Sequence, residues 1–161
     1  MSLKIKLVRI DNRLLHATVA LNWNSFVNSS HIIVVDPEYE NDAFMAKVLQ
    51  LSLPPKTKIN IVSIDSLKQF IRQAENEDEK YQVIILFKKL SVLYQAFQEK
   101  VQFQEVQFPY PASRLMLKSI NSYFSKTEIA QIRIMQQAGI KFYFQTTPMD
   151  SKDYNAFNEV K

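Results

Sequence analysis

Residues 4–23 read KIKLVRIDNRLLHATVALNW and change their periodicity part of the way along. The first six residues, KIKLVR, predict a short β-strand. Beyond it the apolar residues recur at helical spacing, at Leu15, Val19, Trp23 and Phe26. The stretch therefore predicts a strand, a short charged loop and a helix, and this order of elements decides the fold if the rest of the chain repeats it.

The rest of the chain does repeat this alternation. Short apolar runs, each predicted to be a strand, occupy residues 31–35, 58–62, 82–87 and 140–145. Helical stripes lie between them, at Phe44, Met45, Val48 and Leu49 and at Leu67, Phe70, Ile71 and Ala74. Continuous apolar strands are typical of strands that are buried on both faces. The sequence predicts an α/β fold with an open, mainly parallel, doubly wound sheet and helices on both faces.

Helix ends carry signals of their own. Asp36–Pro37 predicts an N-cap followed by the first residue of a helix. Ser125 and Glu128 have the spacing of a capping box, and Gly139, the only glycine in the chain, predicts the left-handed end of the same helix. Two prolines interrupt residues 101–124, where we expect short strands and an irregular loop.

Composition excludes several classes of protein. The 161 residues are 47% hydrophobic and 22% charged, which predicts one globular domain over residues 1–161. The chain has no cysteine, so disulfides and thiolate metal sites are excluded. Its charged start and the lack of a long apolar stretch predict a cytoplasmic protein. The net charge of +4 comes from interspersed signs, which disfavours nucleic-acid binding.

Asp11, Arg13 and His16 lie where the first predicted strand meets the first predicted helix. Open α/β sheets bind ligands at the carboxyl ends of their strands, and the amino end of a helix favours an anion. A neutral imidazole can attack phosphorus, an arginine can pair with phosphoryl oxygens, and a carboxylate can orient either group. The sequence contains no Walker-type glycine loop and no dinucleotide fingerprint. These residues predict a site for a phosphoryl group.

Other interpretations of these residues stay open at this point. A histidine at a helix start is commonly a surface residue, and Asp11 with Arg13 would then be a local ion pair of little energetic value. A domain that binds a small anion without covalent chemistry would use the same residues. His31 is predicted to be a strand-edge histidine, and Trp23 is predicted to lie in the core.

The stretch RIDNRLLHATVALNW (residues 9–23) resembles the phosphorylation loop of the IIB components of the mannose/fructose/sorbose type of the bacterial sugar phosphotransferase system. Residues 32–65 are similar to the second strand, the following helix and the third strand of that family. Residues 83–97 are similar to its fourth strand and next helix, and residues 125–150 to its last helix and strand. The resemblance covers nearly the whole chain.

The resemblance implies a phosphocarrier. His16 matches the phosphorylated histidine, and Asp11 and Arg13 match the acid and the arginine that contact the phosphoryl group or the histidine. Further support of the phosphate loop is implied for Asn12, Ala17 and Thr18. The implied partners are a phosphorylated IIA domain, the membrane IIC and IID components, and the sugar that they bind. The family requires no metal or nucleotide, and its IIB components associate with the membrane through IIC and IID.

Two departures from the family pattern bear on this expectation. The family usually has Gly-Gln after the histidine, where this chain has Ala17 and Thr18, and the Thr18 hydroxyl is a candidate to replace the amide. Residues 108–114, FPYPASR, replace a Gly-Gly-Met segment. These changes motivate an alternative, a regulatory or scaffolding relative with impaired phosphotransfer. Lys88, after the fourth predicted strand, is a candidate for contact with an acidic IIA surface, although solvated loop lysines are commoner.

Overall fold

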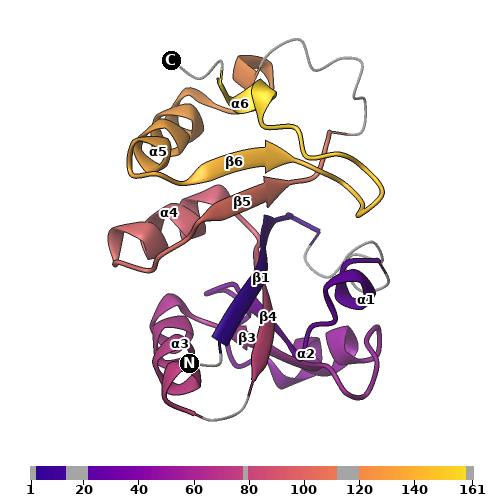
Figure 1. Ribbon diagram of the computed structural model, residues 1–161. Helices are drawn as coiled ribbons and strands as arrows, with labels where there is room; N and C mark the ends of the chain where they lie inside the picture. Colours follow the sequence, from indigo (N-terminus) through magenta and orange to yellow (C-terminus); the bar gives the residue numbers. More distant parts are fainter. Residues whose placement is uncertain (1–2, 14–21, 78–79, 112–119, 159–161) are drawn as a thin grey trace.

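The computed structural model describes residues 3–13, 22–77, 80–111 and 120–158 (Figure 1). Its strands are β1 Leu3–Ile10, β2 His31–Val35, β3 Lys58–Val62, β4 Tyr81–Phe87, β5 Glu105–Phe108 and β6 Lys141–Phe144. Its helices are α1 Asn24–Val27, α2 Ala43–Gln50, α3 Ile64–Asn76, α4 Leu90–Gln98, α5 Lys126–Gln137 and α6 Asn155–Asn158, with a 3-10 turn at Ile120–Ser122. Strands and helices alternate along the described chain, as the sequence predicts.

The six strands form one sheet in the order β3-β2-β4-β1-β5-β6, and every strand pair is parallel. In Figure 1 helices α3, α4 and α5 lie on one side of the sheet, and α1 and α2 lie on the other. The chain moves from β1 toward β3 through α1 and α2, and from β3 toward β6 through α3, α4 and α5. Connections in opposite directions place helices on opposite faces because crossovers are right-handed. The predicted open, doubly wound α/β fold is confirmed.

Each face of the sheet buries a separate apolar core. The face under α3, α4 and α5 packs Leu67, Leu93 and Met135 against the strands. The other face packs Trp23 and Leu49 against β2 and β4. The central strands β2 and β4 contribute to both cores, so their buried residues form continuous apolar runs rather than alternating ones. This double burial explains why the apolar runs predicted the parallel sheet correctly.

Local signals at helix ends were read correctly in two places and wrongly in one. Ser125 and Glu128 form the predicted capping box, and Gly139 has φ +98° just beyond α5. The prediction that Asp36 caps a helix is wrong. Its carboxylate accepts a hydrogen bond from the backbone N of Glu38 (3.0 Å) in a turn, and Asp42 caps α2 by accepting from Met45 N (2.9 Å). Asn41 has φ +61°, a left-handed conformation that separates this turn from α2.

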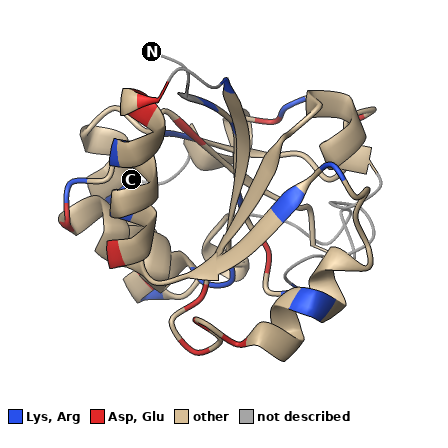
Figure 2. Ribbon diagram, turned by 90° about the horizontal axis from the view of Figure 1, so that it is seen from below, with Lys and Arg blue, Asp and Glu red and all other residues tan. Residues whose placement is uncertain are grey.

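The predicted apolar stripes differ in how far they are buried. The stripe of α3 faces the core, with Leu67 and Ala74 fully buried. In α2, Leu49 is buried but Phe44 and Val48 are exposed, so that prediction holds for half of the stripe. Of the first predicted stripe, Leu15 and Val19 lie outside the described residues. Trp23 is buried as predicted, whereas Phe26 is 67% exposed. Figure 2 shows basic and acidic segments interspersed around the described chain.

Candidate functional site

The site begins where β1 ends. Asp11 follows the last residue of β1, and its backbone N donates a hydrogen bond to Phe87 O (2.9 Å), which extends the ladder between β1 and β4 by one residue. This bond fixes the backbone of Asp11 at the carboxyl edge of the sheet. Its carboxylate is buried, with the residue 3% exposed. A buried carboxylate requires donors around it, and the neighbouring residues supply them.

Two arginines surround the Asp11 carboxylate. Arg13 donates to Oδ1 from its backbone N and from Nε, both at 3.1 Å, and to Oδ2 from Nη2 at 3.2 Å. Arg9 approaches Oδ2 with Nε and Nη2, both at 3.4 Å. The Arg13 side chain is 47% exposed, whereas that of Arg9 is completely buried. The carboxylate thus joins a buried cation to a cation that solvent can reach, and the three groups together carry a net positive charge.

Arg9 is held by the last two strands of the sheet. Its Nη1 donates to Gln107 Oε1 on β5, to Gln145 O (3.1 Å) and to Thr146 O (3.2 Å) at the end of β6. Gln107 Nε2 in turn donates to Gln145 Oε1 (3.2 Å). All three side chains are buried. These hydrogen bonds fix the orientation of the Arg9 guanidinium, which in turn orients Asp11.

The loop after β6 closes over this network. Trp23 donates from Nε1 to Thr146 O (3.0 Å), and Tyr110 N donates to Thr146 Oγ1 (3.0 Å). The Tyr110 hydroxyl also donates to Asp153 Oδ2 (2.6 Å). Thr146 therefore ties the start of α1, the segment after β5 and the segment after β6 together beside Arg9.

Burial and hydrogen bonding act in opposite directions on the two arginines. Burial lowers the pKa of Arg9, and the charge of Asp11 opposes that shift. The hydrogen bond to Asp11 raises the pKa of Arg13. Burial raises the pKa of Tyr123 as well, and the negative charge of Asp11 adds to the effect. An arginine stays protonated in proteins, so Arg13 presents a permanent cation at the sheet edge, where it can pair with an anion.

Lys88 lies on the same edge but outside this network. Ile10 and Phe87 are register partners, so Lys88 follows β4 next to Asp11. Its Nζ is 3.8 Å from Glu38 Oε2 and 5.2 Å from the centre of the Tyr39 ring. The sequence predicted that Lys88 reaches this edge, and it does. Its side chain points to the turn after β2 rather than to Asp11.

The structure thus brings together some of the predicted site residues. Asp11 and Arg13 are in direct contact, and Asn12 between them is exposed. His16, Ala17 and Thr18 lie outside the described residues, as do positions 112–114 of the second departure. His31 begins β2 and packs against the rings of Phe70 and Tyr81 at the opposite edge of the sheet.

Sequence reasoning missed three residues of this site, namely Arg9, Gln107 and Gln145. A signal existed for two of them: Arg9 and Gln145 are polar residues that adjoin or end apolar strands, and buried polar groups require partners. Nothing local indicated that these residues would meet. Within the residues that the structure describes, no group of three or more His, Asp or Glu side chains could hold a metal ion.

An all-parallel, doubly wound sheet with a charged loop at the end of its first strand defines an open α/β protein, a class whose members generally bind ligands at the carboxyl ends of their strands. The sequence model of the family described as "PTS system sorbose subfamily IIB component" matches residues 5–159. The chain belongs to this family. It is a IIB component of a sugar phosphotransferase system with a role in phosphotransfer, and the family implies interaction with IIA and with membrane IIC and IID components.

Known relatives and structures agree with this assignment. The chain is 25% identical to the sorbose-specific EIIB component of Klebsiella pneumoniae over 92% of this chain and 90% of that one. It is 23% identical to N-acetylgalactosamine-specific phosphotransferase enzyme IIB component 1 of Escherichia coli K12, over 92% of this chain and 94% of that one. The crystal structure of manxB from Thermoanaerobacter tengcongensis superposes with a TM-score of 0.77 at 21% identity. The superposition covers 96% of this chain and 94% of that one.

The IIBSor domain of the sorbose permease from Klebsiella pneumoniae also superposes with a TM-score of 0.77, at 24% identity and with 100% and 99% of the two chains covered. These two structures establish the shared fold. In the part of the chain that the structure describes, no helix is long and apolar enough to cross a membrane.

Proposed function

We propose that this chain is a phosphocarrier that accepts a phosphoryl group on His16 from a phosphorylated IIA domain. It passes the group to a sugar that is bound by the membrane IIC and IID partners, and so it associates with the membrane through them. Residues 1–161 act as one IIB domain. Family membership and the position of His16 five residues after Asp11 support this role.

The observation that carries the proposal is the Asp11 carboxylate between Arg9 and Arg13. Asp11 neutralises the buried Arg9 and holds the guanidinium of Arg13 by Nε (3.1 Å) and Nη2 (3.2 Å) at the edge of the sheet. A planar guanidinium held in one orientation is suited to pair with phosphoryl oxygens. Phosphoryl transfer depends chiefly on positioning and charge stabilisation, and this arrangement provides both.

In the proposed mechanism the neutral imidazole of His16 attacks the phosphorus of the donor phosphohistidine in line. A new P–N bond forms on His16, and the P–N bond of the donor breaks with its electron pair returning to the donor imidazole. Arg13 pairs with the equatorial phosphoryl oxygens and stabilises the negative charge on them in the transition state. In the second step a sugar hydroxyl attacks the phosphorus and an O–P bond forms. The P–N bond to His16 breaks with its electron pair returning to the His16 imidazole, and the hydroxyl proton passes to solvent. The chain needs no metal or nucleotide for either step.

Lys88 is proposed to contact the IIA partner. It follows β4 on the same edge as Asp11, and its pair with Glu38 is long and partly exposed. A long ion pair in solvent contributes little stability, so an acidic partner surface can replace Glu38 at little cost. Attraction of this kind speeds the encounter of two proteins.

The test is the intact mass of the chain after incubation with phosphoenolpyruvate, the general phosphotransferase proteins and a IIA donor. We expect one acid-labile phosphoryl adduct in the wild type and none in His16→Gln. An adduct that persists in His16→Gln would place the phosphoryl group on another residue. Absence of any adduct with several IIA donors would favour the regulatory or scaffolding relative, for which the Ala17 and Thr18 positions are the first to restore to Gly and Gln.

A further inference from the structure

Helix α2 is apolar on the face that it turns to solvent. Phe44, Val48 and Leu51 follow one another at the spacing of a helical stripe, and they are 76%, 42% and 82% exposed. The opposite face of the helix is apolar as well, with Leu49 buried against the sheet. A single exposed apolar side chain is common, but three in one stripe mark a surface that contacts another body.

Lysines surround this stripe, and carboxylates do not. Residues 43–62 contain Lys47, Lys56 and Lys58 and no aspartate or glutamate. All three lysines are exposed, and none forms an ion pair with a described carboxylate. We call these three lysines together with Phe44, Val48 and Leu51 the α2 surface.

The fold brings the members of the α2 surface together. Lys47 lies about 60° around the helix axis from Phe44, so it flanks the stripe directly. Gln50 Nε2 donates to Thr57 O (2.9 Å), which holds the start of β3 against the carboxyl end of α2. Lys56 and Lys58 adjoin Thr57 in sequence, and they therefore lie at that end of the helix.

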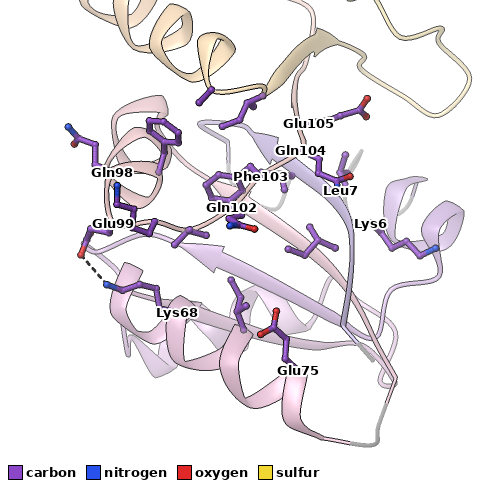
Figure 3. Close-up of a pocket in the computed structure, with 18 of the residues that line it drawn as sticks. Lys6, Leu7, Lys68, Glu75, Gln98, Glu99, Gln102, Phe103, Gln104 and Glu105 are labelled. Carbon is purple, nitrogen blue, oxygen red and sulfur yellow. Dashed lines mark hydrogen bonds and ion pairs between the residues drawn. The ribbon is translucent and has the colours of Figure 1, made fainter. Parts of the chain in front are cut away.

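Lysines elsewhere on the molecule are neutralised by the chain itself. Beside α3 is a cavity of about 1320 Å³, where Lys68 Nζ is 3.3 Å from Glu99 Oε1 (Figure 3). Lys152 lines the same cavity and is 3.3 Å from Glu105 Oε2. The lysines of the α2 surface differ from these because their charge remains available to an anion from outside the chain.

The composition of the α2 surface favours a lipid bilayer over a protein. The centres of protein interfaces are enriched in tyrosine, tryptophan and arginine and depleted in lysine, and the α2 surface has the opposite composition. A second copy of the chain would bring identical lysines together across a two-fold axis. Protruding phenylalanine and leucine beside lysine are typical of segments that lie in the interface of an anionic membrane.

We propose that the α2 surface docks on an anionic lipid bilayer. Phe44, Val48 and Leu51 enter the headgroup region, and the lysines pair with lipid phosphates while their aliphatic stems cover apolar surface. Because α2 begins at the carboxyl edge of the sheet, docking also brings that edge close to the membrane. The proposal stands whether or not His16 carries phosphate.

The test is sedimentation of the full chain with vesicles of equal parts phosphatidylglycerol and phosphatidylcholine. We expect the chain to bind these vesicles, to bind pure phosphatidylcholine at least tenfold more weakly, and to be released as the salt concentration rises. Addition of a paramagnetic doxyl lipid should broaden the amide resonances of Phe44, Val48 and Leu51 before that of Ile134. Ile134 is a suitable reference because it is 44% exposed on α5, on the other side of the sheet (Figure 1).

Matched variants separate the apolar contribution from the charge. Phe44→Ser and Leu51→Ser should each weaken binding about tenfold, whereas Ile134→Ser should not. Lys58→Gln should weaken binding about fivefold, the usual effect of one lysine at an anionic membrane. Lys141→Gln is its control, since Lys58 and Lys141 are the exposed first residues of the two edge strands, β3 and β6.

Three results would each overturn the proposal. The first is no binding to the anionic vesicles at millimolar lipid, and the second is wild-type binding by Phe44→Ser and Leu51→Ser. The third is binding only to vesicles that contain the IIC and IID proteins, with loss in the same variants, which would assign the α2 surface to those proteins instead of to lipid. Circular dichroism confirms that each variant is folded before its binding is compared.

Discussion

Arg9 and Asp11 form an ion pair in which both side chains are buried, with Nη2 of Arg9 3.4 Å from Oδ2 of Asp11. The two residues point to the same face of the sheet because they are two positions apart on an extended chain. Arg9 reaches β5 and β6 from there, while Asp11 reaches the exposed Arg13. The pair thus links the stability of the sheet edge to the orientation of the proposed phosphoryl site, and separate variants distinguish these two roles.

Asp11→Asn should destabilise the fold. The variant leaves the Arg9 guanidinium buried without a counter-charge, and breaking a buried ion pair in this way costs about 3 kcal/mol of unfolding free energy. Urea unfolding followed by circular dichroism measures the change. Asp65→Asn is a suitable control, since Asp65 forms an ion pair with Lys68 while its side chain is 80% exposed, and we expect almost no change there. Equal stability of Asp11→Asn and wild type would contradict the role of the buried pair.

Arg13→Ala should impair phosphotransfer without unfolding the chain. Asp11 keeps Arg9 as a partner in this variant, so the loss of stability should stay below about 1 kcal/mol. Charge-assisted hydrogen bonds to the phosphoryl oxygens are lost, which corresponds to a rate of phosphorylation that is about 10- to 100-fold lower. Rapid-quench measurement of phosphoryl uptake from phosphorylated IIA gives the rate. Arg72→Ala, a substitution in α3, should react at the wild-type rate.

Trp23→Phe should lower the unfolding free energy by about 2 kcal/mol, because the variant loses apolar volume and the hydrogen bond to Thr146 O. Trp23 is the only tryptophan, so its fluorescence reports the unfolding of the wild type, and circular dichroism serves for both proteins. Phe26→Leu is the matched aromatic control. Phe26 is 67% exposed, and we expect it to tolerate the change. Similar losses in the two variants would argue against a specific role of the indole N–H.

Tyr154 should make the fold sensitive to alkaline pH. Burial, followed by the hydrogen bond to Glu105 Oε1 (2.7 Å), raises the pKa of Tyr154 to about 12. A tyrosine in the unfolded chain ionises near pH 10, so this contribution to stability is complete below about pH 10 and disappears as pH rises toward 12. Tyr154→Phe should therefore show a shallower fall of unfolding free energy between these pH values. Absorbance at 295 nm should show one fewer late-titrating tyrosine, and an unchanged pH dependence would refute the assignment.

Thr18→Val tests the first departure from the family pattern. If the Thr18 hydroxyl donates to the phosphoryl group in place of the usual amide, its loss should slow phosphorylation about 10-fold, the value of one hydrogen bond to a charged group. Valine has nearly the same shape, so packing is a minor concern. An unchanged rate of phosphoryl uptake would show that the hydroxyl is not used.

The sequence by itself determined the local features of this protein. Hydrophobic runs predicted the alternating elements and the parallel sheet, and the Ser125 capping box and Gly139 predicted the limits of α5 correctly. Asp11 and Arg13 were predicted as neighbours in one loop, and they are in contact. Each of these features depends on residues within a few positions of one another, so spacing alone contains the information. His16, Ala17 and Thr18 remain predictions.

Only the tertiary structure decided which residues surround the loop that holds Asp11 and Arg13. Gln107 meets Arg9 across 98 positions of sequence and Gln145 across 136, because the strand order places β5 beside β1 and β6 beyond it. The reason is physical: a buried polar group is satisfied by whichever strand end lies nearest in space, and that neighbour is set by crossover connections rather than by local sequence.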